Sequence, residues 1–288
     1  MIPLSSRFPL IPRKKESDKS RYGHVLVLAG SRTMSGAPQL VSRACLASGA
    51  GLLTVGLPQS IRGVFSKRAL AEAMCLPLPE TSSGTLNASA YPKIVSFIRS
   101  RKVSVLALGP GLSHEGGVTS LVRKLVKTVN IPIVLDADGL NAFKGKGGEL
   151  KKHRGPLVVT PHRKEFERLF SKKWPESRGA RAALAKKLSR LYDVSIVLKG
   201  HRTLVVEGGR VYENRTGNPG MAKGGSGDVL TGILAAFIAQ GLSPFKAAAW
   251  AVYFHGKAAD LAVKSKGELG LLAGDIIDAL PQVFRRKK

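Results

Sequence analysis

Cysteine is nearly absent from this sequence of 288 residues. The two that occur, Cys45 and Cys75, stand in apolar surroundings and at no spacing typical of a metal site. We expect them to pack as small hydrophobic side chains rather than to form a disulfide. The sequence is therefore not that of a disulfide-stabilised secreted domain, and it fits the reducing cytoplasm.

Long apolar runs are also missing. The longest uncharged run, 229–245, is interrupted by Gly232, Gly241 and Pro244, and a membrane span needs about 20 continuous apolar residues. The N-terminal stretch MIPLSSRFPLIPRKKESDKSR has prolines in its apolar part and its charges afterwards. A signal peptide has the opposite order. We expect a soluble, cytoplasmic protein that is not associated with a membrane.

Acidic residues are scarce: 19 Asp and Glu stand against 46 Lys and Arg, for a formal net charge of +27. Such a charge attracts nucleic acid, acidic membrane surfaces or small polyanions. The basic residues are nevertheless scattered through segments such as RKLVK, KKH and RGARAALAKKLSR, with no alternating basic and aromatic platform for single strands. This favours a basic solvated surface, and nucleic-acid contact stays open as an alternative.

Aromatic residues make up only 6% of the chain, whereas glycine and alanine are abundant, which suits an α/β enzyme better than a β-sandwich. Short apolar runs alternate with helical patterns, as expected for a mostly parallel, doubly wound sheet covered on both faces. We expect an N-terminal arm over 1–21 and a single domain over 22–288. The predicted strands are 24–30, 52–58, 73–79 at an edge, 103–111, 131–139, the start of 155–166, and 194–214 with a hairpin at Gly208-Gly209. The predicted helices are 37–51, 59–68, 89–101, 117–128, 228–240, 244–264 and 274–284.

Polar or glycine-containing loops follow strand after strand: AGSRTMSG, LGPGLS, DADGLN, TPHRKE and LKGHRT. In open α/β sheets ligands bind outside the carboxyl ends of the strands. These loops therefore predict one composite site at that edge of the sheet.

The stretch TGNPGMAKGGSGDVLTG, 216–232, is rich in glycine and contains one acid, Asp228, at the start of an apolar helix. Consecutive small residues let backbone N–H groups converge on an anion at a helix N-terminus. Asp228 would accept the proton of a substrate hydroxyl beside the phosphate, as a general base in phosphoryl transfer. The alternative is a plain helix cap, although a cap needs no glycine run.

No Walker loop and no opening Rossmann fingerprint occur. The Gly-Xaa-Gly-Asp stretch instead resembles the ribokinase-like superfamily. In order, AGSRTMSGA, SGAGLLTV, LGPGLS, VLDADGLN, VVTPHRKE, VLKGHRT and TGNPGMAKGGSGDVLTG resemble the motifs of the ADP-dependent NAD(P)H-hydrate dehydratases. The resemblance covers roughly residues 20–283. It implies a ribokinase-like α/β fold and a metabolite-repair lyase.

The resemblance implies that ADP, or ATP, phosphorylates the ring hydroxyl of the S epimer of hydrated NADH or NADPH. Elimination of phosphate then restores the dihydropyridine and leaves AMP when ADP is the donor. Because phosphate leaves far more readily than water, a kinase-like site can drive a dehydration. Asp228 would be the base that takes the hydroxyl proton.

Site residues follow from the resemblance by position. Ala37, Gly111 and His162, with Asp228, would contact the hydrated dinucleotide. The nucleotide would be held by Lys199, Gly200, His201, Arg202, Thr203, Gly225, Ser226 and Gly227. Each has a plainer alternative: Gly111 as a turn residue, His162 as a helix cap and Lys199 as a surface lysine.

Related kinases carry Asn-x-x-Glu where this chain has His162 and Glu165, with the glutamate organising magnesium and its waters. Glu165 is therefore the candidate for a Mg²⁺ site, since a hard cation accompanies phosphoryl transfer. Asp136 and Asp138 end a predicted strand at the same edge. One could position the substrate, but Asp138-Gly139 could equally form a turn.

A vitamin or sugar kinase of the same superfamily, such as a hydroxyethylthiazole-type kinase, is the nearest alternative, and it would stop at the phosphorylated product. A nucleic-acid-binding role is the alternative from another class. Relatives often form tetramers, which implies a homo-oligomer. No segment resembles the epimerase domain that many family members carry in front. The chain should therefore process only one epimer unless a separate epimerase partner supplies the other activity.

The family usually reads TPHPGE where this chain has TPHRKE. Arg163 and Lys164 place two cations beside the predicted pocket and could favour the 2′-phosphate of hydrated NADPH. Neutralising both should then weaken the use of hydrated NADPH more than that of hydrated NADH, measured as kcat/KM for each. Equal losses for the two substrates would rule the idea out.

Overall fold

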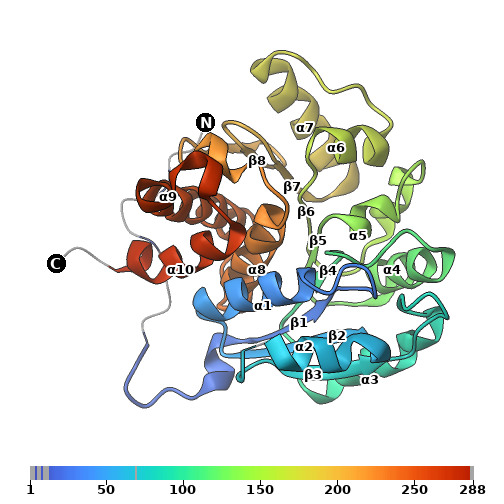
Figure 1. Ribbon diagram of the computed structural model, residues 1–288. Coiled ribbons are helices and arrows are strands. Elements are labelled where there is room, and N and C mark those ends of the chain that lie inside the picture. Colours follow the sequence, from blue (N-terminus) through green and yellow to red (C-terminus); the bar gives the residue numbers. More distant parts are fainter. Residues whose placement is uncertain (1–3, 5–7, 9–12, 69, 286–288) are drawn as a thin grey trace.

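The structure is a computed structural model that describes residues 4, 8, 13–68 and 70–285. A nine-stranded sheet runs through its centre in the order β3-β2-β1-β4-β5-β6-β7-β8-β9 (Figure 1). Neighbouring strands from β3 to β7 are parallel, and β8 and β9 add an antiparallel hairpin. In chain order the strands are β1 (His24–Leu28), β2 (Leu52–Pro58), β3 (Met74–Leu78), β4 (Val105–Leu108), β5 (Ile133–Leu135), β6 (Leu157–Val159), β7 (Ser195–Leu198), β8 (Leu204–Glu207) and β9 (Arg210–Glu213).

Strand β1 shows why the strands of this sheet are continuous apolar runs. Its side chains alternate between the two faces: Val25 and Val27 pack into one core, and Leu26 and Leu28 pack into the other. Because helices cover both faces, both sets of positions favour apolar side chains. This confirms the predicted parallel sheet with two helical layers.

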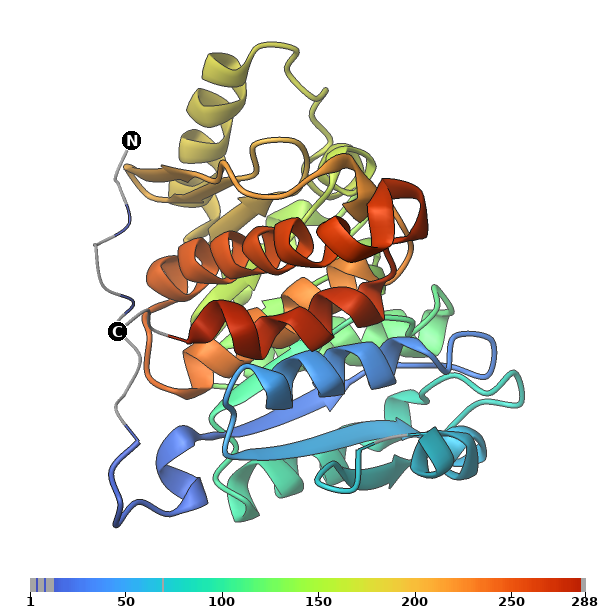
Figure 2. The same ribbon diagram turned by 60° about the vertical axis from the view of Figure 1, so that its left-hand side comes forward.

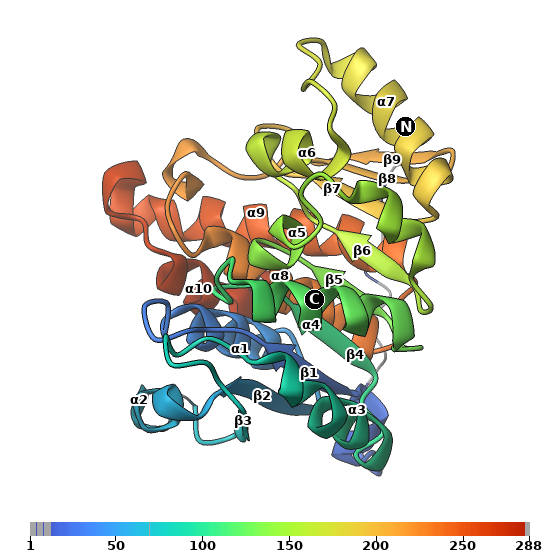
Figure 3. The ribbon, with the colours of Figure 1, turned by 90° about the vertical axis from the view of Figure 1, so that its right-hand side faces the viewer.

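One face is covered by helices from the two ends of the chain, as Figure 2 shows. These are α1 (Ala37–Ala47), α8 (Ser226–Ala239), α9 (Pro244–Gly270) and α10 (Ala273–Phe284), with α2 (Arg62–Arg68) beside β3. The other face is covered by α3 (Tyr91–Ser100), α4 (Gly116–Thr128), α5 (Asp138–Asn141), α6 (Arg163–Phe170) and α7 (Arg178–Tyr192) (Figure 3). Short 3-10 turns complete the chain: η1 (Lys19–Tyr22), η2 (Gln59–Ile61), η3 (Ala88–Ala90), η4 (Gly147–Lys152) and η5 (Pro219–Met221).

Two predicted strands, 103–111 and 131–139, are too long. Strand β4 ends at Leu108 because the chain turns at Gly109, whose φ of 136° favours glycine. Strand β5 ends at Leu135, and Asp138 begins the short helix α5, so this segment is a turn into a helix. The edge strand β3, the hairpin at Gly208-Gly209 and the predicted helices are confirmed to within a few residues; α9 extends to Gly270 across a kink at Gly267.

The predicted N-terminal arm lies partly outside the described residues. Of its described part, the ring of Phe8 packs within 5 Å of the rings of Phe237, Trp250 and Phe254, between centroids. The arm therefore adds an aromatic side chain to the layer formed by α8 and α9. Tyr22 at the end of η1 is buried as well.

The structure describes both cysteines and the helices that were considered as membrane spans. Cys45 is fully buried and Cys75 is half-buried, and both thiols are free. Among the helices of the described chain, none combines the length and the apolarity that a bilayer crossing requires.

Close packing of α1 against α8 depends on Gly232. A Cβ at this position would meet the Val41 carbonyl oxygen and lie 2.8 Å from the Ala44 Cβ. We expect Gly232→Ala to lower the free energy of unfolding by about 1–3 kcal/mol, measured by urea denaturation. Gly179→Ala is the control, because a Cβ at this exposed position in α7 would have no described heavy atom within 4 Å apart from its chain neighbours and the backbone of its own helix. It should raise the same quantity by about 0.5–1 kcal/mol. Equal tolerance of the two changes would contradict the packing argument.

Candidate active site

The loops that follow β1 and β4–β7 meet at the carboxyl edge of the sheet, as their sequence pattern predicts. Ala37 begins α1 after β1, Gly111 follows β4, Asp136 follows β5, His162 follows β6 and Lys199 follows β7. The N-terminal half of α8 reaches the same edge, because Thr231 in its second turn donates a hydrogen bond from its hydroxyl to Asp136. The motifs therefore contribute to one site.

A buried ion pair lies at the centre of this edge. Lys199 Nζ donates to Asp136 Oδ1 at 2.6 Å and lies 3.5 Å from Glu165 Oε2. The side chain of Lys199 is only 18% exposed, and those of Asp136 and Glu165 are 2% and 6% exposed. The alternative of a surface lysine is therefore wrong.

Each member of the pair stabilises the charge of the other. Burial alone would raise the pKa of Asp136, but Lys199 and the hydrogen bonds to this carboxylate hold it below its ordinary value. Burial alone would lower the pKa of Lys199, but Asp136 and Glu165 raise it. Lys199 thus remains a fixed cation in a poorly solvated position.

The glycine run places the N-terminus of α8 directly over this pair. Gly225 caps the helix with φ of 88°, a conformation that favours glycine. A Cβ built on Gly227 would lie 3.5 Å from Lys199 Nζ and 3.6 Å from Asp136 Oδ2. At this N-terminus the backbone N–H groups of Gly227 and Asp228 form no hydrogen bond with a described residue. Together with the Lys199 ammonium they have the chemistry of an anion site.

Asp228 lies in that first turn but is not its cap. The N-cap is Gly225 and makes no side-chain hydrogen bond, and no described residue forms a hydrogen bond or ion pair with the Asp228 carboxylate. Burial, together with the negative charges of Asp136 and Asp138, raises the pKa of Asp228 to about 7, against the opposing effect of Lys199. A carboxylate with this pKa is a suitable general base near neutral pH.

His162 and Glu165 form a capping box at the start of α6. His162 Nδ1 accepts from the backbone N–H of Lys164 at 3.1 Å and of Glu165 at 3.4 Å, and Glu165 Oε2 accepts from the backbone N–H of His162 at 2.8 Å. His162 thus has the structural role of a helix cap. Within the described residues, Glu165 is not part of any cluster of three or more potential metal ligands.

Gly111 and Ala37 lie side by side. Gly111 has φ of 67°, and a Cβ on it would come within 2.9 Å of the Ala37 Cβ and 3.0 Å of the Met34 Cβ. The turn after β4 therefore requires glycine, and the two predicted dinucleotide contacts share one wall of the edge.

The segment KGHRT forms a tight turn from β7 into β8. Thr203 Oγ1 accepts from the Gly200 N–H at 3.3 Å and donates to the Gly200 carbonyl at 2.9 Å. The Arg202 Nε lies 2.7 Å from Glu213 Oε1, while His201 is exposed. The predicted nucleotide contacts of this segment thus surround the end of β7 next to Lys199.

The two cations of the TPHRKE loop differ in their surroundings. The Arg163 guanidinium lies 3.6 Å from Glu167 Oε1 and 3.3 Å from Glu176 Oε1, so nearby acids offset its charge. The exposed Lys164 has no ion pair with any described residue.

Two histidine contacts at this edge were missed by the sequence analysis. His255 in α9 is buried, and its Nε2 lies 3.3 Å from Ser226 Oγ. Burial and the charge of Lys199 lower its pKa to about 4, so it is neutral near pH 7. The other is His114, whose Nδ1 lies 3.1 Å from Asp138 Oδ1. The sequence feature that could have indicated His255 is the presence of a histidine within the Ala-rich predicted helix 244–264.

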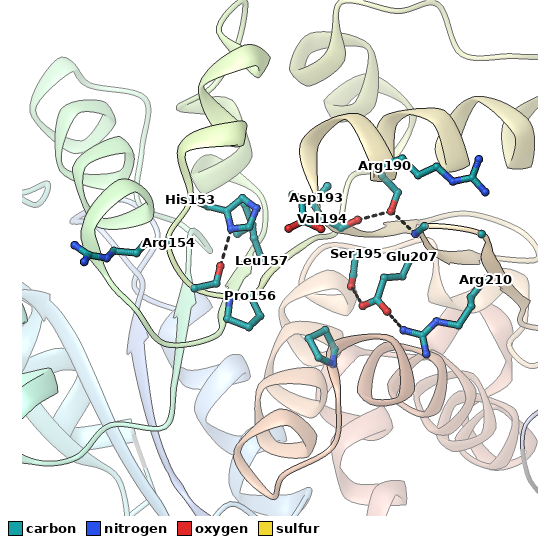
Figure 4. Close-up of a pocket in the computed structure, with 15 residues that line it drawn as sticks. His153, Arg154, Pro156, Leu157, Arg190, Asp193, Val194, Ser195, Glu207 and Arg210 are labelled. Carbon is teal, nitrogen blue, oxygen red and sulfur yellow. Dashed lines mark hydrogen bonds and ion pairs between the residues drawn. The ribbon is translucent and has the colours of Figure 1, made fainter.

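A cavity of about 720 Å³ lies elsewhere, at the amino ends of β6 and β7 (Figure 4). Ser195 Oγ donates to Glu207 Oε1 at 2.6 Å, and Arg210 pairs with the same carboxylate. The side chains of Arg154 and Arg190 point outward in Figure 4. Because this cavity is at the edge opposite Asp228, it is not the predicted site.

The chain is similar to known proteins of one family. Residues 25–282 match the family described as NAD(P)H-hydrate dehydratase. The chain is 42% identical over 277 residues to the bifunctional NAD(P)H-hydrate repair enzyme Nnr of Moorella thermoacetica, covering 96% of this chain and 52% of that protein. It is 34% identical over 286 residues to the ADP-dependent (S)-NAD(P)H-hydrate dehydratase of Neisseria meningitidis, covering 97% and 91%.

Among solved structures, the chain is similar to the ADP/ATP-dependent NAD(P)H-hydrate dehydratase of Bacillus subtilis, co-crystallised with ATP and Mg²⁺. The TM-score is 0.80 and the identity 32%, covering 96% of this chain and 94% of that one. The chain spans about half the length of the bifunctional repair enzymes that it matches.

The raised pKa of Asp228 has a consequence for stability. Its folded value of about 7 lies above the ordinary 3.8, so the folded state binds this proton more tightly than the unfolded state does. The resulting contribution to stability is lost as the pH rises from about 4 through 7. Asp228→Asn should therefore raise the free energy of unfolding by about 1–3 kcal/mol at pH 8 and change it little at pH 4.

Urea denaturation of both proteins at the two pH values measures this difference. Asp278→Asn serves as the control, since its carboxylate is 69% exposed and pairs with Arg43 at the surface. If Asp228→Asn raised the free energy of unfolding equally at both pH values, this result would contradict the raised pKa of Asp228.

Proposed function

Because the chain belongs to the NAD(P)H-hydrate dehydratase family, we propose that it restores NADH and NADPH from the S epimer of their hydrates in an ADP-driven dehydration. The observation that carries this proposal is Asp228, a carboxylate with a pKa of about 7 beside the N-terminus of α8 and the buried Lys199. A proton acceptor and an anion site are thereby adjacent, as phosphorylation of a hydroxyl requires.

The chain's own residues supply a base and positive electrostatic potential. Asp228 accepts the proton of the ring hydroxyl as its oxygen attacks the terminal phosphorus of the nucleotide. The N–H group of Gly227 and the ammonium of Lys199 stabilise negative charge on the transferred phosphoryl group. Once phosphorylated, the former hydroxyl is a good leaving group, and loss of phosphate regenerates the ring double bond.

The predicted binding residues fit two substrates at one edge. Lys199–Thr203 and Gly225–Gly227 would hold the nucleotide, and Ala37, Gly111 and His162 would contact the hydrated dinucleotide. His255 would orient the Ser226 hydroxyl, 3.3 Å away. ADP would yield AMP and phosphate, and ATP is the alternative donor.

Magnesium is part of the proposal. Glu165 is the carboxylate that would face it, through waters, on the side of Lys199. A site with one nearby carboxylate and no cluster of three protein ligands in the described chain fits an ion held mainly by nucleotide phosphates. When bound, the ion would neutralise phosphate charge.

Further parts of the proposal concern the whole protein. We propose a single domain over 22–288 after the arm 1–21, a homotetramer by analogy with relatives, and a cytoplasmic location. Epimerisation would fall to another domain or another protein. The scattered basic residues would attract anionic substrates rather than nucleic acid.

The assay follows absorbance at 340 nm after the protein and Mg²⁺ are added to chemically prepared hydrated NADH, with ADP, ATP or neither. We expect recovery that requires a nucleotide and falls by about 100-fold or more in Asp228→Asn. Asp278→Asn should keep full activity, because this carboxylate in the middle of α10 is exposed and pairs with Arg43. Nucleotide consumption without recovery of absorbance would instead indicate a small-molecule kinase.

A further inference from the structure

The proposed dehydration requires a second proton acceptor, and this inference rests on that proposed function. In the hydrate, water has added across a ring C=C bond, so one carbon carries the hydroxyl and its neighbour carries the added hydrogen. Restoring the double bond removes both. Asp228 has already taken the hydroxyl proton when phosphate departs, so it is not free to take the proton from the neighbouring carbon.

His114 and Asp138 form an acid–base pair at this edge. His114 Nδ1 lies 3.1 Å from Asp138 Oδ1. Asp138 is fixed by two further contacts, since its Oδ2 accepts from the Ser113 backbone N–H at 2.9 Å and its Oδ1 accepts from Asn141 Nδ2 at 3.2 Å. The Asp138 side chain is 11% exposed and the His114 side chain 67% exposed.

This arrangement matches that of a catalytic histidine held by an aspartate. A carboxylate against Nδ1 keeps the ring proton on that nitrogen and leaves Nε2 as the acceptor. No described residue forms a hydrogen bond or ion pair with His114 Nε2, and the ring is open to solvent. The acceptor nitrogen is therefore available to a ligand.

The pair also lies on the side of the site where the hydrated dinucleotide is predicted to bind. His114 belongs to the loop after β4 that contains Gly111, and this loop contacts Met34 and Ala37 of the loop after β1. Asp138 follows Asp136, the buried partner of Lys199, by two residues. The charge of Asp138 contributes to the raised pKa of Asp228, which places the two acid–base groups close enough to interact electrostatically across one site.

We infer that His114, positioned by Asp138, is the base that removes the ring proton in the elimination step. The ring nitrogen lone pair expels phosphate, which leaves with the electron pair of the C–O bond. His114 Nε2 then takes the proton from the adjacent carbon, and the electrons of that C–H bond form the restored C=C bond. The imidazolium returns its proton to water.

A single-turnover experiment with enzyme in excess over hydrated NADH and ADP separates the two half-reactions. Formation of AMP reports phosphorylation, absorbance at 340 nm reports elimination, and ³¹P NMR reports a phosphate ester. In the unaltered protein, AMP and absorbance should appear together. In His114→Gln, AMP should form at nearly the normal rate while absorbance recovers about 100-fold more slowly and the phosphate ester accumulates.

Asp138→Asn tests positioning and should show the same separation to a smaller degree. His153→Gln is the matched control, because this histidine lines the cavity at the opposite edge and should change neither half-reaction. Absorbance that keeps pace with AMP in His114→Gln would overturn the inference and assign the proton to the departing phosphate or to water. A protein that makes no AMP at all would fail at the proposed function instead, which is a different result.

Discussion

The buried pair of Lys199 and Asp136 is the interaction on which the site depends. An isolated charge in this position would be strongly destabilising, whereas a pair with satisfied hydrogen bonds can be tolerated. Asp136 is satisfied by Lys199 and Thr231 at 2.6 and 2.8 Å. These contacts join β5, β7 and α8, which are far apart in sequence, and they fix a cation beneath the α8 N-terminus. Burial and this negative charge of Asp136 together raise the pKa of Asp228.

Much of this arrangement could be predicted from the sequence. Apolar runs that end in glycine or polar residues predicted the parallel strands and the edge at which their loops meet. The glycine run before Asp228 predicted a helix N-terminus with exposed backbone N–H groups, because few other structural needs explain such a run at a helix start. Strand ends were less accurate: the conformations of Gly109 and of Asp138 depend on contacts between the β4 and β5 loops, which a single sequence does not reveal.

The partners of the polar residues could not be predicted for the same reason. The sequence shows that Lys199 is a cation. Only the fold places it in contact with Asp136, which is 63 residues away in the chain. His162 illustrates the opposite case, since its local sequence predicted both a helix cap and a ligand contact, and the structure has the cap. No sequence pattern indicated His114, because its proposed role depends on its contact with Asp138, which lies in the loop after the next strand.

Burial beside Asp136 should keep the Asp228 carboxyl partly protonated near neutral pH. A ¹³C NMR titration of protein labelled at the aspartate carboxyl carbons measures this directly, with Asp228→Asn identifying the resonance. We expect a midpoint near pH 7, and a lower midpoint in Asp136→Asn, where one negative charge is removed while Lys199 remains. A midpoint near pH 4 in the unaltered protein would contradict it.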